Sequence, residues 1–244
     1  MVNSLYIGLS EQIALRHQMD GIAHNVANLN TAGFKREEVL FREFLVPAED
    51  AGKKVNYSYV LDFGSARDLA EGSMITTGNT FDLAIRGEGF FVIETEQGER
   101  YTRNGHFSIN DEGTLVTTSG DPVLDQSGRQ LSFSPQDGEI TISSDGSISA
   151  EFAEFGGSRI GVVTFDDLRA MKKAGDGMYE TDQIPIDPEK MTVQQGKIES
   201  SNVNAVMEMT RMIDVSRRYQ TIQRMIDAGY ELKRTAIQRL GSVL

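Results

Sequence analysis

The chain has 244 residues, with 36 acidic and 24 basic side chains and a formal net charge of -12. An acidic chain lacks the basic face that phosphate contacts need, so nucleic acid is not an expected partner. Cysteine is absent, which excludes disulfides, thiolate metal sites and cysteine nucleophiles. Its length and its 39% apolar content fit one or two domains with a modest core.

Neither a cleaved leader nor a membrane span is expected. The opening residues are not a basic segment followed by an apolar one, and they turn polar again at Ser10-Glu11-Gln12. No run of 18 apolar residues occurs, so direct membrane insertion is not predicted. Charge divides the chain into three zones: residues 1–42 are neutral, residues 203–244 carry a net +3, and the middle holds the remaining -15.

The first zone is predicted to be helical. Its apolar residues follow a 3-4 spacing, which is the seam of a heptad pattern. The helix should end near Asn28 to Gly33, where Asn and Gly favour a left-handed cap. The seam positions are Leu5, Gly8, Gln12, Leu15, Met19, Ile22, Val26 and Leu29.

The last zone repeats this pattern, and Ser201-Asn202 is predicted to cap its helix. A helix from Val203 to Leu240 is long for a compact domain of this size and favours a coiled coil. Its seam positions include Met212, Val215, Tyr219, Ile222 and Ile226. The two terminal helices, in segments 1–42 and 196–244, are therefore expected to pair with each other and with further copies. For a lone helix, packing on its own domain is the simpler interpretation.

The middle zone is predicted to be β-rich over 76–195. Short β-prone runs alternate with turns such as Asn104-Gly105, Asp137-Gly138 and Asp145-Gly146, the pattern of antiparallel hairpins. A short helix is expected at about 167–172. Segment 43–75 is less patterned and is interpreted as an extended connector. The fold class is α+β: long terminal helices paired as a coiled coil, with a central, mostly antiparallel β domain.

The sequence contains no recognisable motif of a catalytic site. His17 and His24 share a helix face without a third ligand, which makes a weak metal site. The Gly87-Glu88-Gly89 motif lacks the third glycine and the following helix of a dinucleotide site. We therefore predict no cofactor, no metal and no enzymatic activity.

Residues 22–36, IAHNVANLNTAGFKR, resemble the N-terminal signature of the bacterial flagellar rod and hook family, with His24 in place of the usual first Asn. Residues 196–209, GKIESSNVNAVMEM, resemble the C-terminal stretch of the same family. Segments 78–91 and 101–107 resemble its central region. The residues that carry the terminal resemblance are Asn25, Ala27, Asn28, Thr31, Gly33, Phe34, Lys35, Ser201, Asn202 and Val203.

This resemblance implies a structural subunit of the basal-body rod, the drive shaft that crosses the periplasm. Within the family the opening of the chain is most similar to the proximal rod branch, and the distal rod branch is the alternative. The implied partners are copies of the chain, neighbouring rod proteins and the flagellar type III export apparatus, which needs no cleaved signal. The expected assembly interface comprises Leu15, Met19, Ile22, Val26, Leu29, Met212, Val215, Tyr219, Ile222 and Ile226.

Two further alternatives belong to other classes. One is a coiled-coil adaptor that carries a β recognition domain and does not polymerise. The other is a hydrolase hidden in the β domain. We also expect Gly33 to need a backbone conformation open mainly to glycine, and Gly33→Val to impair assembly more than it destabilises the β core.

Overall fold

The computed structural model describes residues 2–50, 53–152 and 157–241, which form two α-helices and fifteen β-strands. Every pairing between these strands is antiparallel. The α+β fold class predicted from the sequence is therefore confirmed. Neither of the two helices is long and apolar enough to span a membrane.

The chain divides into two compact units. Met1–Ala27, Glu37–Asp68 and Asn204–Leu244 form the first, which we call the helical unit. Asn28–Arg36 and Leu69–Val203 form the second, which we call the β unit. The β unit thus includes the segment after the first helix and the segment before the last one, both of which lie outside the predicted boundaries of 76–195.

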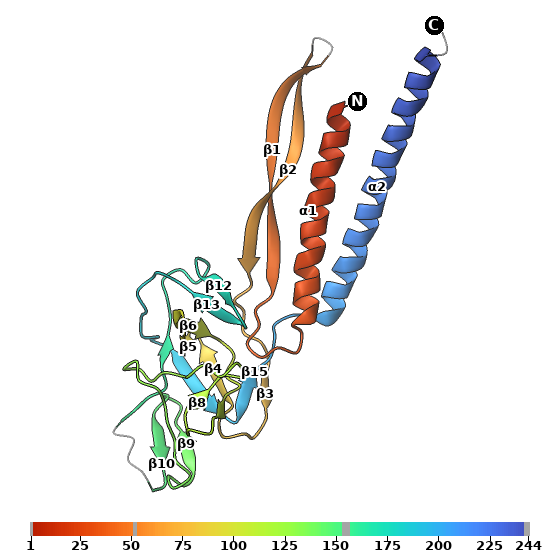
Figure 1. Cartoon of the computed structure of the whole chain (residues 1–244). Helices are drawn as coiled ribbons and strands as arrows, with labels where there is room; N and C mark the ends of the chain where they lie inside the picture. The colour runs from red at the N-terminus through yellow and green to blue at the C-terminus, as the bar shows by residue number, and fades with distance from the viewer. Residues whose placement is uncertain (1, 51–52, 153–156, 242–244) are drawn as a thin grey trace. The chain divides into compact units, whose positions relative to one another are not determined.

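In the helical unit, α1 (Val2–Ala27) and α2 (Ala205–Gly241) lie side by side and antiparallel (Figure 1). The α1 helix ends directly before Asn28, where the sequence predicted the turn. The start of α2 differs from the prediction, because its cap is Asn204 and not Ser201-Asn202. The Met207 N–H donates to Asn204 Oδ1 at 3.1 Å, the geometry of an N-cap residue and its third helical position.

The helical unit also contains a long hairpin of β1 (Glu37–Asp50) and β2 (Lys53–Arg67). Most of this hairpin falls in the segment predicted to be an extended connector. Its two strands are joined at residues 51–52, which lie outside the described residues, without any of the glycine dipeptides that mark two-residue hairpin turns. The hairpin packs on α1, where a Cβ added to Gly21 would lie 3.0 Å from Val39 Cγ2.

The β unit is built from short strands. Its main sheet has five strands in the order β11-β5-β6-β13-β12, and the remaining strands form two-stranded ladders: β14 with β4, β15 with β3, β10 with β9, and β7 with β8. A turn and β12 replace the short helix expected at 167–172, so that expectation was wrong. The strands are β3 (Met74–Thr76), β4 (Leu83–Gly87), β5 (Phe90–Thr95), β6 (Gly98–Thr102), β7 (Ser108–Ile109), β8 (Leu115–Val116), β9 (Ile140–Ile142), β10 (Ile148–Ala150), β11 (Val162–Val163), β12 (Lys172–Gly175), β13 (Met178–Glu180), β14 (Met191–Gln195) and β15 (Lys197–Glu199).

Strand β5 is buried on both faces and separates two apolar clusters. Because side chains alternate along a strand, Phe91 and Ile93 enter the larger cluster while Phe90 and Val92 enter the smaller one. In the larger cluster the ring of Phe91 meets Phe107 edge to face, with centroids 5.1 Å apart. The β unit therefore has a core of its own.

Gly33 lies in the β unit and has the left-handed backbone that the sequence predicted, with φ of 68°. A Cβ at this position would lie 2.4 Å from the backbone carbon of Arg103, closer than any real contact. The steric conflict therefore falls inside the β unit. A larger residue at Gly33 should therefore destabilise the β core directly, and whether Gly33→Val impairs assembly still more than core stability stays a prediction.

We predict that Gly33→Ala lowers the free energy of unfolding of the β unit by more than the ~1–2 kcal/mol of a left-handed alanine. Gly78→Ala is the matched control, because its φ of 74° is nearly the same and no atom lies within 4 Å of its added Cβ. Denaturant unfolding followed by near-UV circular dichroism measures both. Equal losses in the two variants would show that close packing at Gly33 contributes nothing.

Candidate assembly interface

The two terminal helices meet along the predicted seam. Leu15, Ile22 and Val215 are buried against one another within this one chain. Gly8, a seam position without a side chain, lets Ile226 approach closely: an added Cβ would lie 3.2 Å from Ile226 Cγ1. The partly buried seam residues that pack on this cluster are Met19, Val26, Met212, Tyr219 and Ile222. Leu29 is the exception among the predicted interface residues, since it lies beyond the end of α1 in the β unit.

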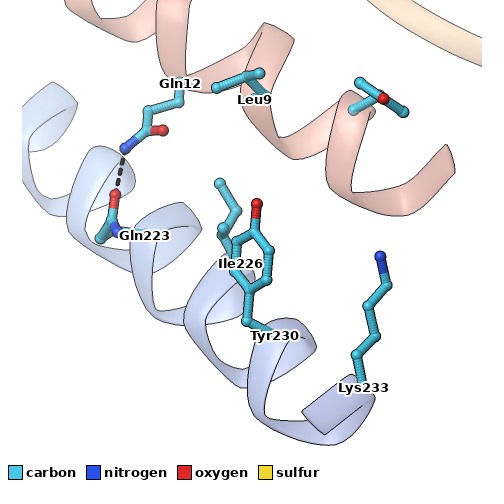
Figure 2. A pocket seen from close by; sticks show the side chains of 7 residues that line it. Leu9, Gln12, Gln223, Ile226, Tyr230 and Lys233 are labelled. Atoms are coloured by element: carbon cyan, nitrogen blue, oxygen red, sulfur yellow. Dashed lines mark hydrogen bonds between the residues drawn. The ribbon is translucent and has the colours of Figure 1, made fainter. Parts of the chain in front are cut away.

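A hollow of about 220 Å³ lies between the two helices, nearer the N-terminal end of α1. Figure 2 shows Leu9 and Gln12 on one helix facing Ile226 and Tyr230 on the other. A hydrogen bond from Gln12 Nε2 to Gln223 Oε1 crosses between the helices beside it. Tyr6 and Lys233 complete the lining. The seam is therefore less tightly filled here than at Leu15 and Val215.

A buried polar group sits at the other end of the seam. Asn25, in the last turn of α1, is 1% exposed and forms two hydrogen bonds with the backbone of Glu37 in β1. Its Nδ2 donates to Glu37 O at 2.7 Å, and its Oδ1 accepts from Glu37 N at 2.9 Å. The same Nδ2 also donates to Glu208 Oε2 of α2 at 3.3 Å, and Arg211 pairs with the other carboxylate oxygen at 2.8 Å. Asn25 thus joins α1, α2 and β1.

The β unit contains a second buried polar group, which we call the Glu199 cluster: Lys35, Arg103 and Glu199. Lys35 Nζ donates to Glu199 Oε1 at 2.7 Å, and Arg103 Nε donates to Glu199 Oε2 at 2.8 Å. The side chains are 4%, 5% and 1% exposed respectively. The Gly72 N–H completes the shell of the carboxylate by donating to Glu199 Oε1 at 2.9 Å.

Both cations also donate to backbone carbonyl groups. Lys35 Nζ donates to Ala70 O at 2.8 Å. The guanidinium of Arg103 donates to three carbonyl oxygens around the β4–β5 turn, those of Ile85, Gly87 and Gly89. Bonds of this kind, which use most of the donors of both cations, are what allows an ionic group to be buried.

Two opposing effects act on the titration of the cluster. Burial alone would raise the pKa of Glu199, but the charges of Arg103 and Lys35 and the hydrogen bonds from Lys35 and Gly72 together outweigh it and hold that pKa below its usual value. Burial, together with the smaller effect of the Arg103 charge, lowers the pKa of Lys35 by more than the hydrogen bond and charge of Glu199 raise it. Glu199 is therefore ionised throughout the neutral range.

Short hydrogen bonds between backbone groups surround the cluster. The N–H of Gly33 donates to Glu199 O at 2.8 Å, and the N–H of Ser200 donates to Ser73 O at 2.8 Å. Asn202, which the sequence suggested as a helix cap, accepts from the Arg36 N–H at 2.7 Å and donates to Ala70 O at 3.0 Å. Segments 33–36, 70–73 and 199–202 are thereby tied together.

The residues that carried the terminal resemblance thus serve two different sites. Asn25 belongs to the helical unit, and Ala27 is the last residue of α1. The others lie in the β unit. There Asn28 Oδ1 accepts from the Thr31 hydroxyl at 3.1 Å, Phe34 is buried with Lys173 Nζ 5.4 Å from its ring centroid, and Ser201 Oγ accepts from the Val203 N–H at 3.3 Å.

Sequence reasoning missed Glu199, Arg103 and Glu208 as site residues, although each lies in a segment that resembles the family. The one sequence feature that could have pointed to these residues is that each is a charged residue inside a segment that resembles the family. Its partners could not be inferred, because Lys35 and Arg103 are 164 and 96 positions from Glu199.

His106 and His24 each have an acidic neighbour. His106 Nδ1 is 2.7 Å from Asp82 Oδ1, and His24 Nδ1 is 3.9 Å from Glu37 Oε2. Among the described residues no three His, Asp or Glu side chains gather in a way that could hold a metal ion.

Two long helices that pair across an apolar seam, with a separate β unit between them in the sequence, agree with the arrangement predicted from the residue pattern. Three family descriptions match the chain. "Flagella basal body rod protein" covers residues 5–35, "Flagellar hook protein FlgE/F/G D1 domain" covers 84–150, and "Flagellar basal body rod FlgEFG protein C-terminal" covers 194–239. The chain belongs to the flagellar basal-body rod protein family.

Relatives within this family match over the whole length. The flagellar basal-body rod protein FlgF of Caulobacter vibrioides is 42% identical over 100% of both chains. FlgF of Mesorhizobium japonicum is 36% identical over 99% of both. The rod protein FlgG of Bacillus subtilis is 32% identical, over 95% of this chain and 97% of its own. Among these three, similarity is greater to the FlgF proteins than to FlgG.

We predict that Asn25→Ala lowers the free energy of unfolding of the helical unit by about 1–3 kcal/mol, because it leaves buried polar groups of Glu37 and Glu208 without this partner. Gln220→Ala, at an exposed position on α2, is the control and should change it by less than about 0.5 kcal/mol. Thermal unfolding at 222 nm reports the helices. Indistinguishable curves for the two variants would contradict the role of Asn25.

The Glu199 cluster predicts acid sensitivity of the β unit. A carboxyl group whose pKa is lowered on folding contributes stability that is fully present above its unfolded pKa, near 4.5, and is lost as pH falls through the folded value. The free energy of unfolding should therefore decline below about pH 4.5. Lys35→Met should make this decline shallower, because the folded pKa of Glu199 moves closer to normal. Denaturant titrations between pH 7 and 3 measure how the free energy of unfolding changes with pH in the wild type and in Lys35→Met. Equal pH dependence in the two proteins would refute the effect of Lys35 on the pKa of Glu199.

Proposed function

We propose that this protein is a structural subunit of the flagellar basal-body rod, in its proximal part, and that its terminal helices assemble with copies of the chain and with neighbouring rod proteins. The observation that carries the proposal is the full-length similarity to proteins named FlgF. In this role the protein transmits torque and performs no catalysis. Export through the flagellar type III apparatus into the periplasmic space is part of this proposal.

The surface of the helical unit supports assembly. The two helices pack on each other along the seam, yet large apolar side chains of both remain exposed. Tyr6 is 59% exposed on α1, and Ile237 is 70% exposed on α2. The α2 helix has 37 residues against 26 in α1, a difference of about 16 Å at 1.5 Å per residue. Apolar surface of this kind is what a heterologous, non-closing interface between subunits would cover. A coiled-coil arrangement of the helices in the rod is part of this proposal.

The distal rod is the second candidate, supported by the 32% identity to a FlgG protein. Genetic complementation separates the two. A gene for this chain that restores swimming to a strain lacking FlgF, and not to a strain lacking FlgG, supports the proximal position. The opposite pattern supports the distal one.

We predict that Ile226→Asp and Ile237→Asp both abolish rod assembly and swimming, for different reasons. Ile226 is 9% exposed and packs within the chain, so its replacement buries a carboxylate in the seam between α1 and α2. Ile237 is exposed in the single chain, so its replacement leaves the subunit intact and places a charge where a neighbouring subunit would pack. The measurements are electron microscopy of purified basal bodies and swimming in soft agar.

Gln220→Asp, an exposed polar position on α2, is the matched control and should swim normally. In all three variants the melting of the β unit should be unchanged, because that unit has its own core. If Ile237→Asp cells build complete rods, the exposed apolar surface of α2 is not an assembly interface. A non-polymerising adaptor would then be the better interpretation.

A further inference from the structure

The Glu199 cluster combines residues from distant parts of the β unit. Its carboxylate accepts from Lys35, Gly72 and Arg103, which come from the beginning, the first third and the middle of the chain. Glu199 itself ends β15, which pairs with β3 through Lys197 with Thr76 and Glu199 with Met74. The cluster therefore cannot form until residue 199 of the 244 is present.

The absence of Glu199 leaves two buried cations without their bonded carboxylate. Lys35 and Arg103 are 4% and 5% exposed, so neither can be solvated without opening the fold. Glu71 attracts Lys35 from a distance, but it is exposed and its Oε1 accepts from the Gly87 N–H. Breaking a buried pair on one side is strongly destabilising because the other charge stays uncompensated. Here one missing residue leaves two such charges.

The same segment satisfies backbone groups of the early chain. The Gly33 N–H and the Gly72 N–H both donate to Glu199, and the Arg36 N–H donates to Asn202. By contrast, the strands from β3 to β14, and with them both apolar clusters, lie before residue 197. A chain that lacks only 197–203 thus has its apolar core residues and lacks the group that neutralises its buried cations.

We propose that the Glu199 cluster is a folding checkpoint: the β unit closes only when segment 197–203 arrives. A chain is synthesised from its N-terminus, so nearly all of the β unit is delivered before its closing carboxylate. The two cations keep this part of the chain open during that time. Folding of the β unit is thereby coupled to delivery of segment 197–203, which follows the first four fifths of the sequence.

The first test uses the wild-type sequence on stalled ribosomes, in three lengths that expose residues 1–196, 1–203 and 1–244 outside the tunnel. A short pulse of protease reports whether the β unit is closed. We expect the chain exposing 1–196 to be cleaved within 69–196 at least tenfold faster than the other two, which should resist equally. Equal resistance at 1–196 would overturn the proposal. Resistance only at 1–244 would also overturn it, because the signal for closure would then be α2.

The second test uses full-length variants. Glu199→Gln should lower the ratio of folded to unfolded β unit by about a hundredfold or more, because both cations lose their counter-charge. Glu189→Gln, at an exposed carboxylate nearby in the sequence, is the matched control and should change this ratio less than threefold.

The double variant Lys35→Met, Glu199→Gln separates the charge effect from simple loss of packing. Removing Lys35 deletes one of the two uncompensated cations, so the double variant should recover at least tenfold of the stability that Glu199→Gln loses. If the losses of the single variants multiply instead, Lys35 and Glu199 act independently, and buried charge does not control closure of the β unit.

Discussion

The β unit depends on one buried carboxylate. The chain passes between the two units at residues 27–28, 36–37, 68–69 and 203–204, and on the β-unit side the segments next to three of these crossings meet at Glu199. These segments are short and mostly without regular secondary structure, and they offer few apolar side chains for packing. Hydrogen bonds between charged side chains replace that packing. They require every member of the Glu199 cluster, because a charged side chain without its partner would be a buried, uncompensated charge.

In the helical unit a buried neutral side chain has a corresponding role. A seam of Leu, Ile, Met and Val at 3-4 spacing can pack in more than one register, whereas a buried polar residue finds its hydrogen-bond partners in one register only. Asn25 is such a residue, because its amide forms hydrogen bonds with both backbone groups of Glu37 and with the carboxylate of Glu208. The alignment of α1, α2 and β1 is therefore set by a side chain that apolar periodicity alone would not single out.

Local signals predicted much of the fold. The terminal helices and their seam follow from the 3.6-residue periodicity, and short strands such as β5 follow from β-prone runs between turns. The hairpin of β1 and β2 was missed because none of the glycine dipeptides of tight hairpin turns joins its strands. The cap of α2 was displaced from Asn202 to Asn204 because Asn202 is engaged with Arg36 and Ala70. The Glu199 cluster could not be predicted, because its bonds join residues far apart in the sequence and sequence alone does not pair charges.

The two units also differ in how they meet other molecules. Residues 28–36 and 69–203 contain 23 acidic and 12 basic side chains, whereas the remainder of the chain contains 13 and 12. Like charge opposes association between β units. The helical unit, by contrast, is nearly balanced in charge, and its helices leave apolar side chains such as Leu232 and Ile237 exposed. In the proposed assembly, attraction between copies would therefore be concentrated in the helical unit, while the β unit folds on its own buried contacts.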